Sequence, residues 1–223
     1  MHIPETHKET VTGVYERIDP SPPTDSVIQE SYRNRAEKIL RADKNHYERH
    51  APLIRKKITE AGIPFDYCVA WAGGHPKLEA KAGFESVDVI DAIADMYQQS
   101  DDLFQEIYGP CLVDYVKSEI TPKLVASRVF MQHDGYANTF VHFLEHLTRL
   151  EAIELLKACD GTPIIIYGPN IESAQNDGWF HFRPADHNTF WTGDAFARLL
   201  GTLGYGNVSI CNIDEDYLII ATQ

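Results

Sequence analysis

A glycine-containing turn and an acidic residue beyond it form the pattern of this sequence best suited to binding a ligand. An apolar run over residues 65–71 leads into Gly73 and Gly74, and a second apolar run ends at Asp91, 17 residues after Gly74. Strand, turn, helix and strand in this order are typical of a nucleotide-binding βαβ unit. Glycine lets backbone N–H groups approach a ligand, and a carboxylate at the second strand tip can accept two hydrogen bonds from a ribose diol. The pattern predicts an adenosine-type cofactor; a plain turn followed by a solvated acid is the alternative.

Histidine is the residue type of this chain best able to exchange a proton near neutral pH. The ten histidines include His133, which follows an apolar run, and His181 and His187, which lie in an aromatic-rich loop. We expect one of these three to act as a general base if the reaction needs one, and most of the others to lie on solvated surfaces. His142 and His146 have the i, i+4 spacing of a helix face. Without a third ligand at a recognisable spacing, they predict no metal site.

The aromatic-rich loop over residues 178–187 has two possible roles. It follows a predicted strand, so it would lie at the edge where open α/β sheets bind ligands and form one wall of an acceptor pocket. Arg183 would then suit a carboxylate or phosphate group on the acceptor. The alternative is an ordered surface loop that tucks its aromatic side chains under the end of the chain.

Charge and composition limit the classes of partner. The chain has 20 Lys and Arg against 33 Asp and Glu, a net charge of −13, which would repel a nucleic-acid backbone. Its four cysteines are widely spaced without a CxxC pair, so we interpret them as buried, reduced thiols. The sequence has no run of ~18 apolar residues and no apolar leader pattern. We therefore expect a cytoplasmic protein that acts on a small molecule and binds neither nucleic acid nor membrane.

Alternating strand and helix patterns predict how these residues are positioned. We expect strands at residues 65–71, 87–91, 111–115, 123–130 and 164–167, with helices over residues 92–107 and 140–153 between them. Strict alternation favours a parallel, doubly wound sheet. A helix carrying Phe196 and Leu203 then ends at Gly204. The strands that follow, at residues 207–213 and 217–222, are joined by so short a turn that they must form an antiparallel hairpin.

The first 60 residues differ from the rest of the chain. Residues 1–24 are polar and contain Pro20, Pro22 and Pro23, so we expect an arm that is mobile or ordered only by packing. Helical periodicity over residues 26–40 and 53–61 predicts two helices, which either cap the mouth of the sheet or cover its flank. We therefore divide the chain into an N-terminal arm with cap helices, residues 1–60, and a cofactor-binding domain, residues 61–223.

From about residue 60 to its end, the sequence resembles the class I S-adenosylmethionine-dependent methyltransferases. Residues 70–76 are similar to the family's glycine-rich loop, 87–96 to its second strand and ribose-binding acid, 125–133 to its fourth strand, and 190–205 to the helix before the terminal hairpin. The resemblance implies an α/β fold with a doubly wound, mostly parallel seven-stranded sheet and an antiparallel C-terminal hairpin. It also implies S-adenosylmethionine as cofactor and methyl transfer to an O or N atom of a small molecule. The oligomeric state stays open, a homodimer being possible.

The same resemblance assigns roles to individual residues. His133, directly after the expected fourth strand, would be the catalytic base, and His187 and His181 are the alternatives. Residues 143–147, with His146, are a second candidate for the segment that follows the fourth strand. We prefer His133 because an apolar run directly precedes it, whereas His146 lies within a helical period. The cofactor would be bound by residues in or beside the first four strands: Trp71, Ala72, Gly73, Gly74, Asp91, Ala92, Asp114 and Ser127.

Three positions of the loop depart from the family pattern. Ala70 stands where the family has an acid, and Ala72 and Pro76 stand where it has its first and last glycines. This departure favours an alternative function, a catalytically degenerate methyltransferase-fold protein that serves as a binding or scaffolding module. A nicotinamide-dependent oxidoreductase is a third possibility, against which the antiparallel ending and the lack of a G-x-G-x-x-G motif both argue.

Overall fold

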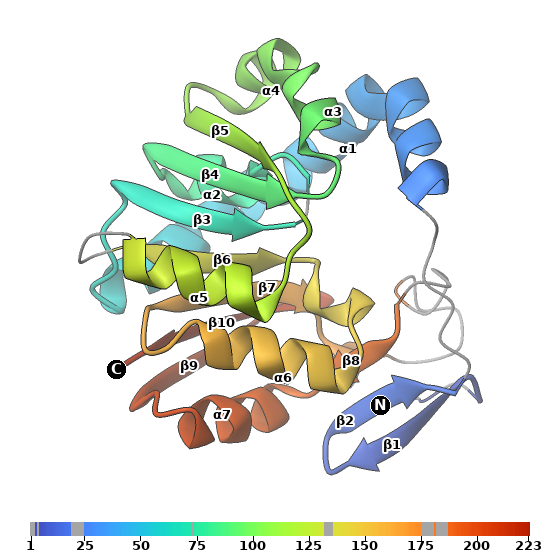
Figure 1. The fold of residues 1–223 in the computed structure, drawn as a ribbon, viewed down its shortest axis with the longest axis vertical. Helices are drawn as coiled ribbons and strands as arrows, with labels where there is room; N and C mark the ends of the chain where they lie inside the picture. The colour runs from blue at the N-terminus through green and yellow to red at the C-terminus, as the bar shows by residue number, and fades with distance from the viewer. Residues whose placement is uncertain are drawn as a thin grey trace.

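A seven-stranded sheet forms the centre of the protein (Figure 1). The computed structural model describes residues 3, 5–18, 25–72, 74–131, 136–174, 181 and 187–223. In chain order the strands of the sheet are β3 (Tyr67–Trp71), β4 (Ser86–Asp91), β5 (Leu112–Lys117), β6 (Ala137–Val141), β7 (Ile164–Pro169), β9 (Asn207–Ile213) and β10 (Asp216–Thr222). Their spatial order is β5-β4-β3-β6-β7-β10-β9.

The strand directions confirm the predicted sheet. β3 pairs in parallel with β4 and β6, β4 with β5, and β6 with β7, whereas β10 runs antiparallel to both β7 and β9. Because β10 runs the other way, its first residue, Asp216, lies opposite Pro169 at the end of β7. Asp216 therefore reaches the sheet edge at which the parallel strands end.

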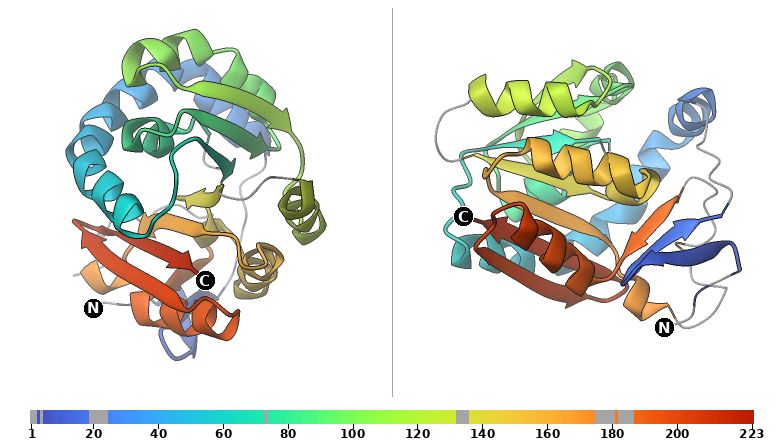
Figure 2. Two further views of the ribbon diagram at one scale, coloured as in Figure 1. Left: turned by 90° about the vertical axis from the view of Figure 1, so that its left-hand side faces the viewer. Right: turned by 60° about the horizontal axis from the view of Figure 1, so that its bottom comes forward.

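Helices cover both faces of the sheet (Figures 1 and 2). One layer contains α1 (Asp25–Glu60), α2 (Lys77–Ala82) and α4 (Asp101–Tyr108). The other contains α5 (Pro122–Met131), α6 (Arg149–Ala158) and α7 (Gly193–Thr202). The chain moves outward through β4 and β5 on one side of β3 and through β6 and β7 on the other. The boundary between β3 and β6 is thus a topological switch point, where open α/β sheets bind ligands.

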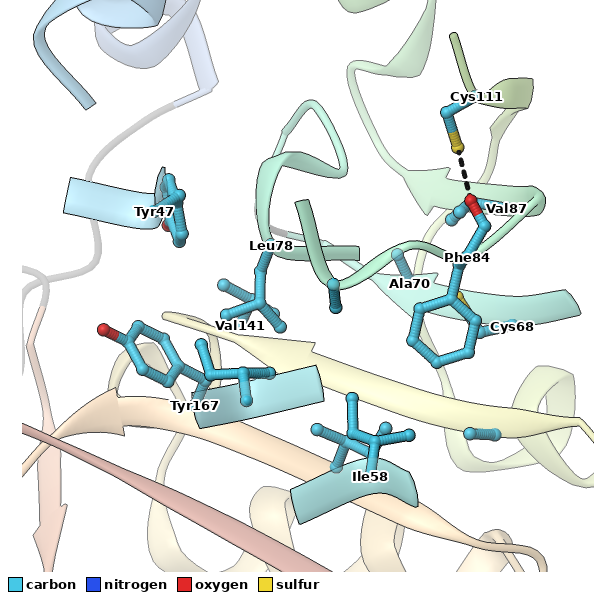
Figure 3. Close-up of a cluster of buried hydrophobic side chains, with 14 of the residues drawn as sticks. Tyr47, Ile58, Cys68, Ala70, Leu78, Phe84, Val87, Cys111, Val141 and Tyr167 are labelled. Atoms are coloured by element: carbon cyan, nitrogen blue, oxygen red, sulfur yellow. Dashed lines mark hydrogen bonds between the residues drawn. The ribbon is translucent and has the colours of Figure 1, made fainter. Parts of the chain in front are cut away.

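A single helix, α1, replaces the two helices predicted before the first strand. It runs for 36 residues and continues through Pro52, although an internal proline costs a helix about 3 kcal/mol. Leu40 before the proline, and Ile54 and Ile58 after it, all belong to one buried core cluster, so packing on both sides of Pro52 holds the helix together. Figure 3 shows part of this cluster, in which Ile58 of α1 is joined by side chains of β3, α2 and β6. The second half of α1 therefore covers the flank of the sheet.

Part of the predicted N-terminal arm is a β-hairpin. β1 (His7–Val11) and β2 (Val14–Arg17) pair with each other, and β2 also pairs with β8 (Thr189–Trp191), which makes a separate three-stranded antiparallel sheet. This sheet lies beside one end of the central sheet (Figure 2, right). Its strands come from opposite ends of the chain, so no local pattern indicates the pairing. The three prolines of the predicted arm lie outside the described residues.

The prediction of a strand over residues 123–130 is wrong, because this segment is α5. The apolar run fits either element, but the residues before it carry a helix start that the strand interpretation overlooked. Thr121 accepts a hydrogen bond from the backbone N–H of Leu124 at 3.2 Å, and Pro122 takes the first helical position, where its missing N–H costs nothing. Only one side of the helix is buried, with Val125 inside and Ser127 exposed.

The prediction of a helix over residues 140–153 is also wrong. The fourth strand of the parallel set is β6, all of whose residues are buried, and α6 starts only after a 3₁₀ turn, η1 (Leu144–His146). Asn138 hides this strand in the sequence because it is a buried polar residue, bonded to Trp71 and Thr162. The helix predicted at 92–107 is two short ones, α3 (Ala94–Gln98) and α4. Among the described helices, none combines the length and apolar character that crossing a membrane requires.

Candidate functional site

A cleft of about 840 Å³ opens at the carboxyl edge of the sheet. Side chains reach it from α1, from the start of α2, from the segments that follow β6 and β7, and from the turn between β9 and β10. Its lining residues are Asp43, His46, Tyr47, Arg49, Lys77, Val141, His142, Glu145, His146, His181, His187, Asp214, Glu215 and Asp216. Five carboxylates and two permanently cationic side chains are among them. Both cations are paired, Lys77 with Asp43 and Arg49 with Asp214, each at 2.6 Å, so Glu145, Glu215 and Asp216 give the cleft a negative character.

The turn after β6 brings three of these residues together. His142 has a left-handed backbone, with φ +47°, and its N–H donates to the carbonyl of Tyr167 at 2.8 Å. This conformation is uncommon for a residue with a side chain, and it bends the chain directly from β6 into η1. Glu145 and His146 follow in η1, and Glu145 is only 5% exposed.

The segment before β8 is tied to η1 by its backbone. The N–H of Asn188 donates to the carbonyl of Glu145 at 2.6 Å, and its side-chain amide donates to the carbonyl of His146 at 2.7 Å. The hydroxyl of Thr189 donates to the carbonyl of Leu147 at 2.7 Å. His187 is therefore held beside His146, with ring centroids 4.7 Å apart.

Asp216 is the buried acid on the other side of these histidines. It is 3% exposed, and three imidazoles face it: His46 Nε2 lies 3.5 Å from Oδ2, and His181 Nε2 and His142 Nε2 lie 3.7 and 3.9 Å from Oδ1. Within the described residues, Oδ1 of Asp216 and Oε1 of Glu145 have no hydrogen-bond partner. His142 Nδ1 lies 3.4 Å from Glu145 Oε1 and forms an ion pair with it when the imidazole is protonated.

Burial and the charges of neighbouring groups shift the pKa values of these residues in different directions. Burial lowers the pKa of His181 to about 4, helped by His142 and opposed by Asp216 and Glu145, so His181 is neutral at neutral pH. Burial also lowers the pKa of His142, but the carboxylates of Glu145 and Asp216 outweigh it and raise that pKa above its ordinary value. For Glu145, burial raises the pKa, but the surrounding histidines outweigh it and lower the pKa to about 2. The cleft thus combines a buried carboxylate with a neutral imidazole.

A hydrogen-bonded network around the Tyr167 hydroxyl connects the cleft with the core. The hydroxyl of Tyr167 on β7 is bonded to His46 Nε2 at 2.8 Å and to His50 Nδ1 at 3.1 Å. His50 in turn lies 3.1 Å from a carboxylate oxygen of Asp214. These contacts fix α1 against the carboxyl ends of β7 and β9, and they explain why α1 supplies cleft residues although its second half packs on the flank.

The predicted cofactor residues of β3 and β4 lie at the same sheet edge, next to the cleft. Asp91 ends β4, is 8% exposed, and accepts a hydrogen bond from the N–H of Ile93 at 2.9 Å, with Ala92 between them. Ala72 has a left-handed φ of +54°. Gly74 has φ +80°, and a Cβ there would lie 3.2 Å from the Tyr97 ring. The close approach that this glycine permits is therefore to Tyr97.

Four other residues predicted for the cofactor lie elsewhere or outside the described part of the chain. The indole of Trp71 donates to Asn138 Oδ1 at 2.8 Å in the core, so only its backbone faces the loop. Asp114 is exposed in the middle of β5, in register with Asp88, three residues before the strand ends. Ser127 is exposed on α5 and donates to the carbonyl of Leu124 at 2.7 Å. Gly73 lies outside the described residues.

Two of the three predicted catalytic histidines, His181 and His187, do line the cleft. His133 and Arg183 lie outside the described residues, and the strand that was expected to precede His133 is a helix. Sequence reasoning missed Asp216 and His46, and it preferred His133 to residues 143–147, which contain Glu145 and His146. A signal was present for Glu145 and His146, because both directly follow β6 once that strand is placed at 137–141.

Comparison with known proteins bears on the fold. No protein-family model and no curated protein sequence matches the chain. Solved structures do match: an O-methyltransferase family protein from Burkholderia thailandensis has a TM-score of 0.65 at 13% identity over 92% of this chain. Human N-acetylserotonin methyltransferase in complex with SAM matches with a TM-score of 0.60 at 12% sequence identity over 90% of this chain. The mitomycin 7-O-methyltransferase MmcR matches with a TM-score of 0.57 at 10% identity over 90% of this chain.

The fold is that of the class I methyltransferases. The chain spans 65%, 60% and 61% of the length of these three structures, respectively. At such low identity the likeness concerns the fold alone. The strand order of the sheet agrees with the methyltransferase resemblance seen in the sequence.

Proposed function

We propose that this protein transfers the methyl group of S-adenosylmethionine to an oxygen or nitrogen atom of a small molecule. The observation that carries this proposal is the cleft of about 840 Å³, lined by histidines and carboxylates, at the carboxyl edge of a class I methyltransferase fold. Fold alone does not define chemistry, so the residues of this cleft have to supply what methyl transfer needs.

The residues beside the cleft fit the cofactor. Asp91, at the tip of β4 and beside the switch point, would accept hydrogen bonds from the ribose hydroxyls. The backbone at Ala72 and Gly74, which follows β3, would border the rest of the molecule. The bound sulfonium supplies an activated methyl group, so the protein has to align the acceptor and exclude water.

The cleft next to these residues suits an acceptor that must lose a proton. His181 is neutral at neutral pH, and it faces Asp216, which would stabilise the imidazolium formed when His181 accepts a proton. A phenol or another weakly acidic hydroxyl is the acceptor class that gains most from such a base. The negative lining and the net charge of −13 oppose an RNA acceptor.

The test uses S-adenosylmethionine with a labelled methyl group and a panel of phenols, amines and one RNA oligonucleotide. We expect label to appear on a small molecule, most readily a phenol, with stoichiometric formation of S-adenosylhomocysteine. Label on the RNA alone would contradict the small-molecule proposal. Tight S-adenosylmethionine binding without transfer to any acceptor would favour the scaffolding alternative.

A further inference from the structure

We propose that Glu145, His146 and His187 bind a divalent first-row transition-metal ion in the cleft, with Zn²⁺ the best match. One ligand atom from each of these residues lies within 4.8 Å of the other two. Two imidazoles and one carboxylate are a donor set of catalytic zinc sites, in which three protein ligands leave a further position open.

The spacing of the three side chains is close to what such a site requires. Metal–ligand distances of about 2.0–2.2 Å place the ligand atoms of a tetrahedral zinc site roughly 3.3 Å apart. From separations of up to 4.8 Å, each atom would move inward by less than about 1 Å, an adjustment that side-chain torsions can make. The backbones need no movement, since Asn188 already ties the two segments together.

The hydrogen bonding of His187 prepares it to be a ligand. Its Nδ1 lies 2.8 Å from the carbonyl oxygen of His181, and a carbonyl only accepts hydrogen bonds. Nδ1 is therefore the protonated nitrogen, and the lone pair of the neutral ring is on Nε2. Metal-bound histidines typically donate their second ring N–H to a carbonyl or carboxylate in this way, which fixes both tautomer and ring orientation.

An unsatisfied carboxylate provides an independent indication of a cation. Glu145 is 95% buried, yet its Oε1 meets no hydrogen-bond criterion within the described residues and has only the longer contact with His142 Nδ1, at 3.4 Å. Buried carboxylate oxygens are normally bonded because the loss of their hydration is costly. Asp216 adds a second buried carboxylate nearby, on the far side of His142. A divalent cation would satisfy Glu145 and balance the negative lining of the cleft.

The sequence predicted no metal because it offered only a histidine pair on one supposed helix. In the structure His142 belongs to the turn after β6 rather than to a helix shared with His146. The third ligand comes from His187, which lies 41 positions after His146. Such a spacing matches no local motif, so only the tertiary fold reveals the site.

Metal binding can be measured without any methyl transfer, so its failure is distinguishable from failure of the proposed function. Tag-free protein, stripped with a chelator and dialysed, would be titrated with Zn²⁺ by calorimetry and with Co²⁺ by visible absorption. We expect one Zn²⁺ per chain and a Co²⁺ spectrum of nitrogen and oxygen coordination. Mg²⁺, which prefers oxygen ligands, should bind far more weakly.

Three single variants, His146→Gln, His187→Gln and Glu145→Gln, should each weaken Zn²⁺ binding by more than the roughly 10–100-fold that loss of an outer-shell partner costs. Glu154→Gln is the control, since Glu154 is an exposed carboxylate of α6 outside the cleft lining, and it should bind Zn²⁺ like the wild type. Equal affinity in all four variants would overturn the proposal.

The wild-type protein alone provides a second test in case a variant fails to fold. Co²⁺ should shift the signals of two imidazole N–H protons, one from each ligating histidine. A thiolate-to-cobalt absorption band would instead indicate a cysteine site, and absence of stoichiometric binding would indicate a purely protonic cluster. Either result would overturn the assignment.

Discussion

Single side chains decide what the cleft can do. Asp216 reaches it only because β10 is antiparallel and begins at the edge where the other strands end. His181 faces this carboxylate at 3.7 Å and, unlike His187, is not among the three proposed metal ligands. His181 is therefore the described residue best placed to accept a proton from the substrate.

We predict that His181→Gln lowers kcat by ~10²–10⁴-fold, the usual contribution of a general base, and leaves the Kd for S-adenosylmethionine unchanged. Glutamine keeps hydrogen-bonding capacity but cannot accept the proton. Steady-state kinetics and calorimetry measure the two quantities. Glu154→Gln, with an exposed side chain on α6 outside the cleft lining, should retain normal kcat. A normal kcat in His181→Gln would mean that another group, or alignment alone, serves the reaction.

The sequence predicted the place of a site residue only where a local pattern marked that residue. Asp91 was predicted from the end of an apolar run, and it does lie at the carboxyl edge. Glu145 and His146 follow a helical spacing in the sequence, and Asn138 obscures the strand before them. Asp216 was not recognised at all, since its place depends on the direction of β10.

At the scale of elements, the loop after β3 has an unusual support. His75 is buried, stacked on Phe104 with ring centroids 4.9 Å apart, and bonded to the Tyr115 hydroxyl at 2.6 Å and to Ser100 Oγ at 3.0 Å. Burial, with a smaller effect of Lys77, lowers the pKa of His75 from 6.5 to about 3. A neutral imidazole therefore joins this loop to α4 and β5.

This histidine should make stability depend on pH. Because the folded-state pKa of about 3 lies below the unfolded value of 6.5, the unfolded chain binds the proton more tightly. The stability that His75 contributes is fully present above pH 6.5 and is lost as pH falls toward 3. By about pH 5 the loss amounts to about 2 kcal/mol. His75→Phe keeps the stacking but cannot titrate, so we expect its free energy of unfolding to fall less between about pH 7 and pH 5. Parallel curves for the two proteins in denaturant titrations would contradict this.

A neighbouring pair in α1 tests how this helix packs. Ile54 is 1% exposed in the core whereas Leu53 is 37% exposed. Ile54→Ala should lower the free energy of unfolding by ~2–5 kcal/mol, the cost of a cavity in a packed core. Leu53→Ala, the matched control, should cost less than about 1 kcal/mol. Similar losses from both, measured by urea unfolding, would mean that α1 does not cover the sheet as described.

The elements most open to misinterpretation were those without a clear period. Residues 123–130 are a short apolar stretch that fits a buried strand or a helix until its start signal and its exposure are known. Residues 137–141 contain Asn138 and Thr139 and so lack the apolar run typical of a buried strand. For α5 the start signal is Thr121 followed by Pro122. Long or strongly alternating elements, such as α7 and the terminal hairpin, were predicted correctly.

At the scale of the whole molecule, the strand order follows from rules that a sequence does carry. Strands alternating with helices must form parallel crossovers, and a short terminal turn must make an antiparallel pair. Nothing local indicated that β1 and β2 pair with β8, or that α1 is one helix. Both depend on contacts between distant parts of the chain.

The proposed methyl transfer requires a cofactor bound beside the cleft. Calorimetric titration of the wild type and Asp91→Asn with S-adenosylmethionine, S-adenosylhomocysteine and NAD tests this binding most directly. We predict that the wild type binds the first two and not NAD. Asp91→Asn should lose at least about tenfold in affinity, because each hydrogen bond to a charged acceptor contributes roughly 1.5–3 kcal/mol. Asp114→Asn, with its exposed side chain in the middle of β5, provides the comparison on the neighbouring strand and should bind normally. A wild type that binds neither adenosyl compound, or an Asp91→Asn variant with unchanged affinity, would contradict the account.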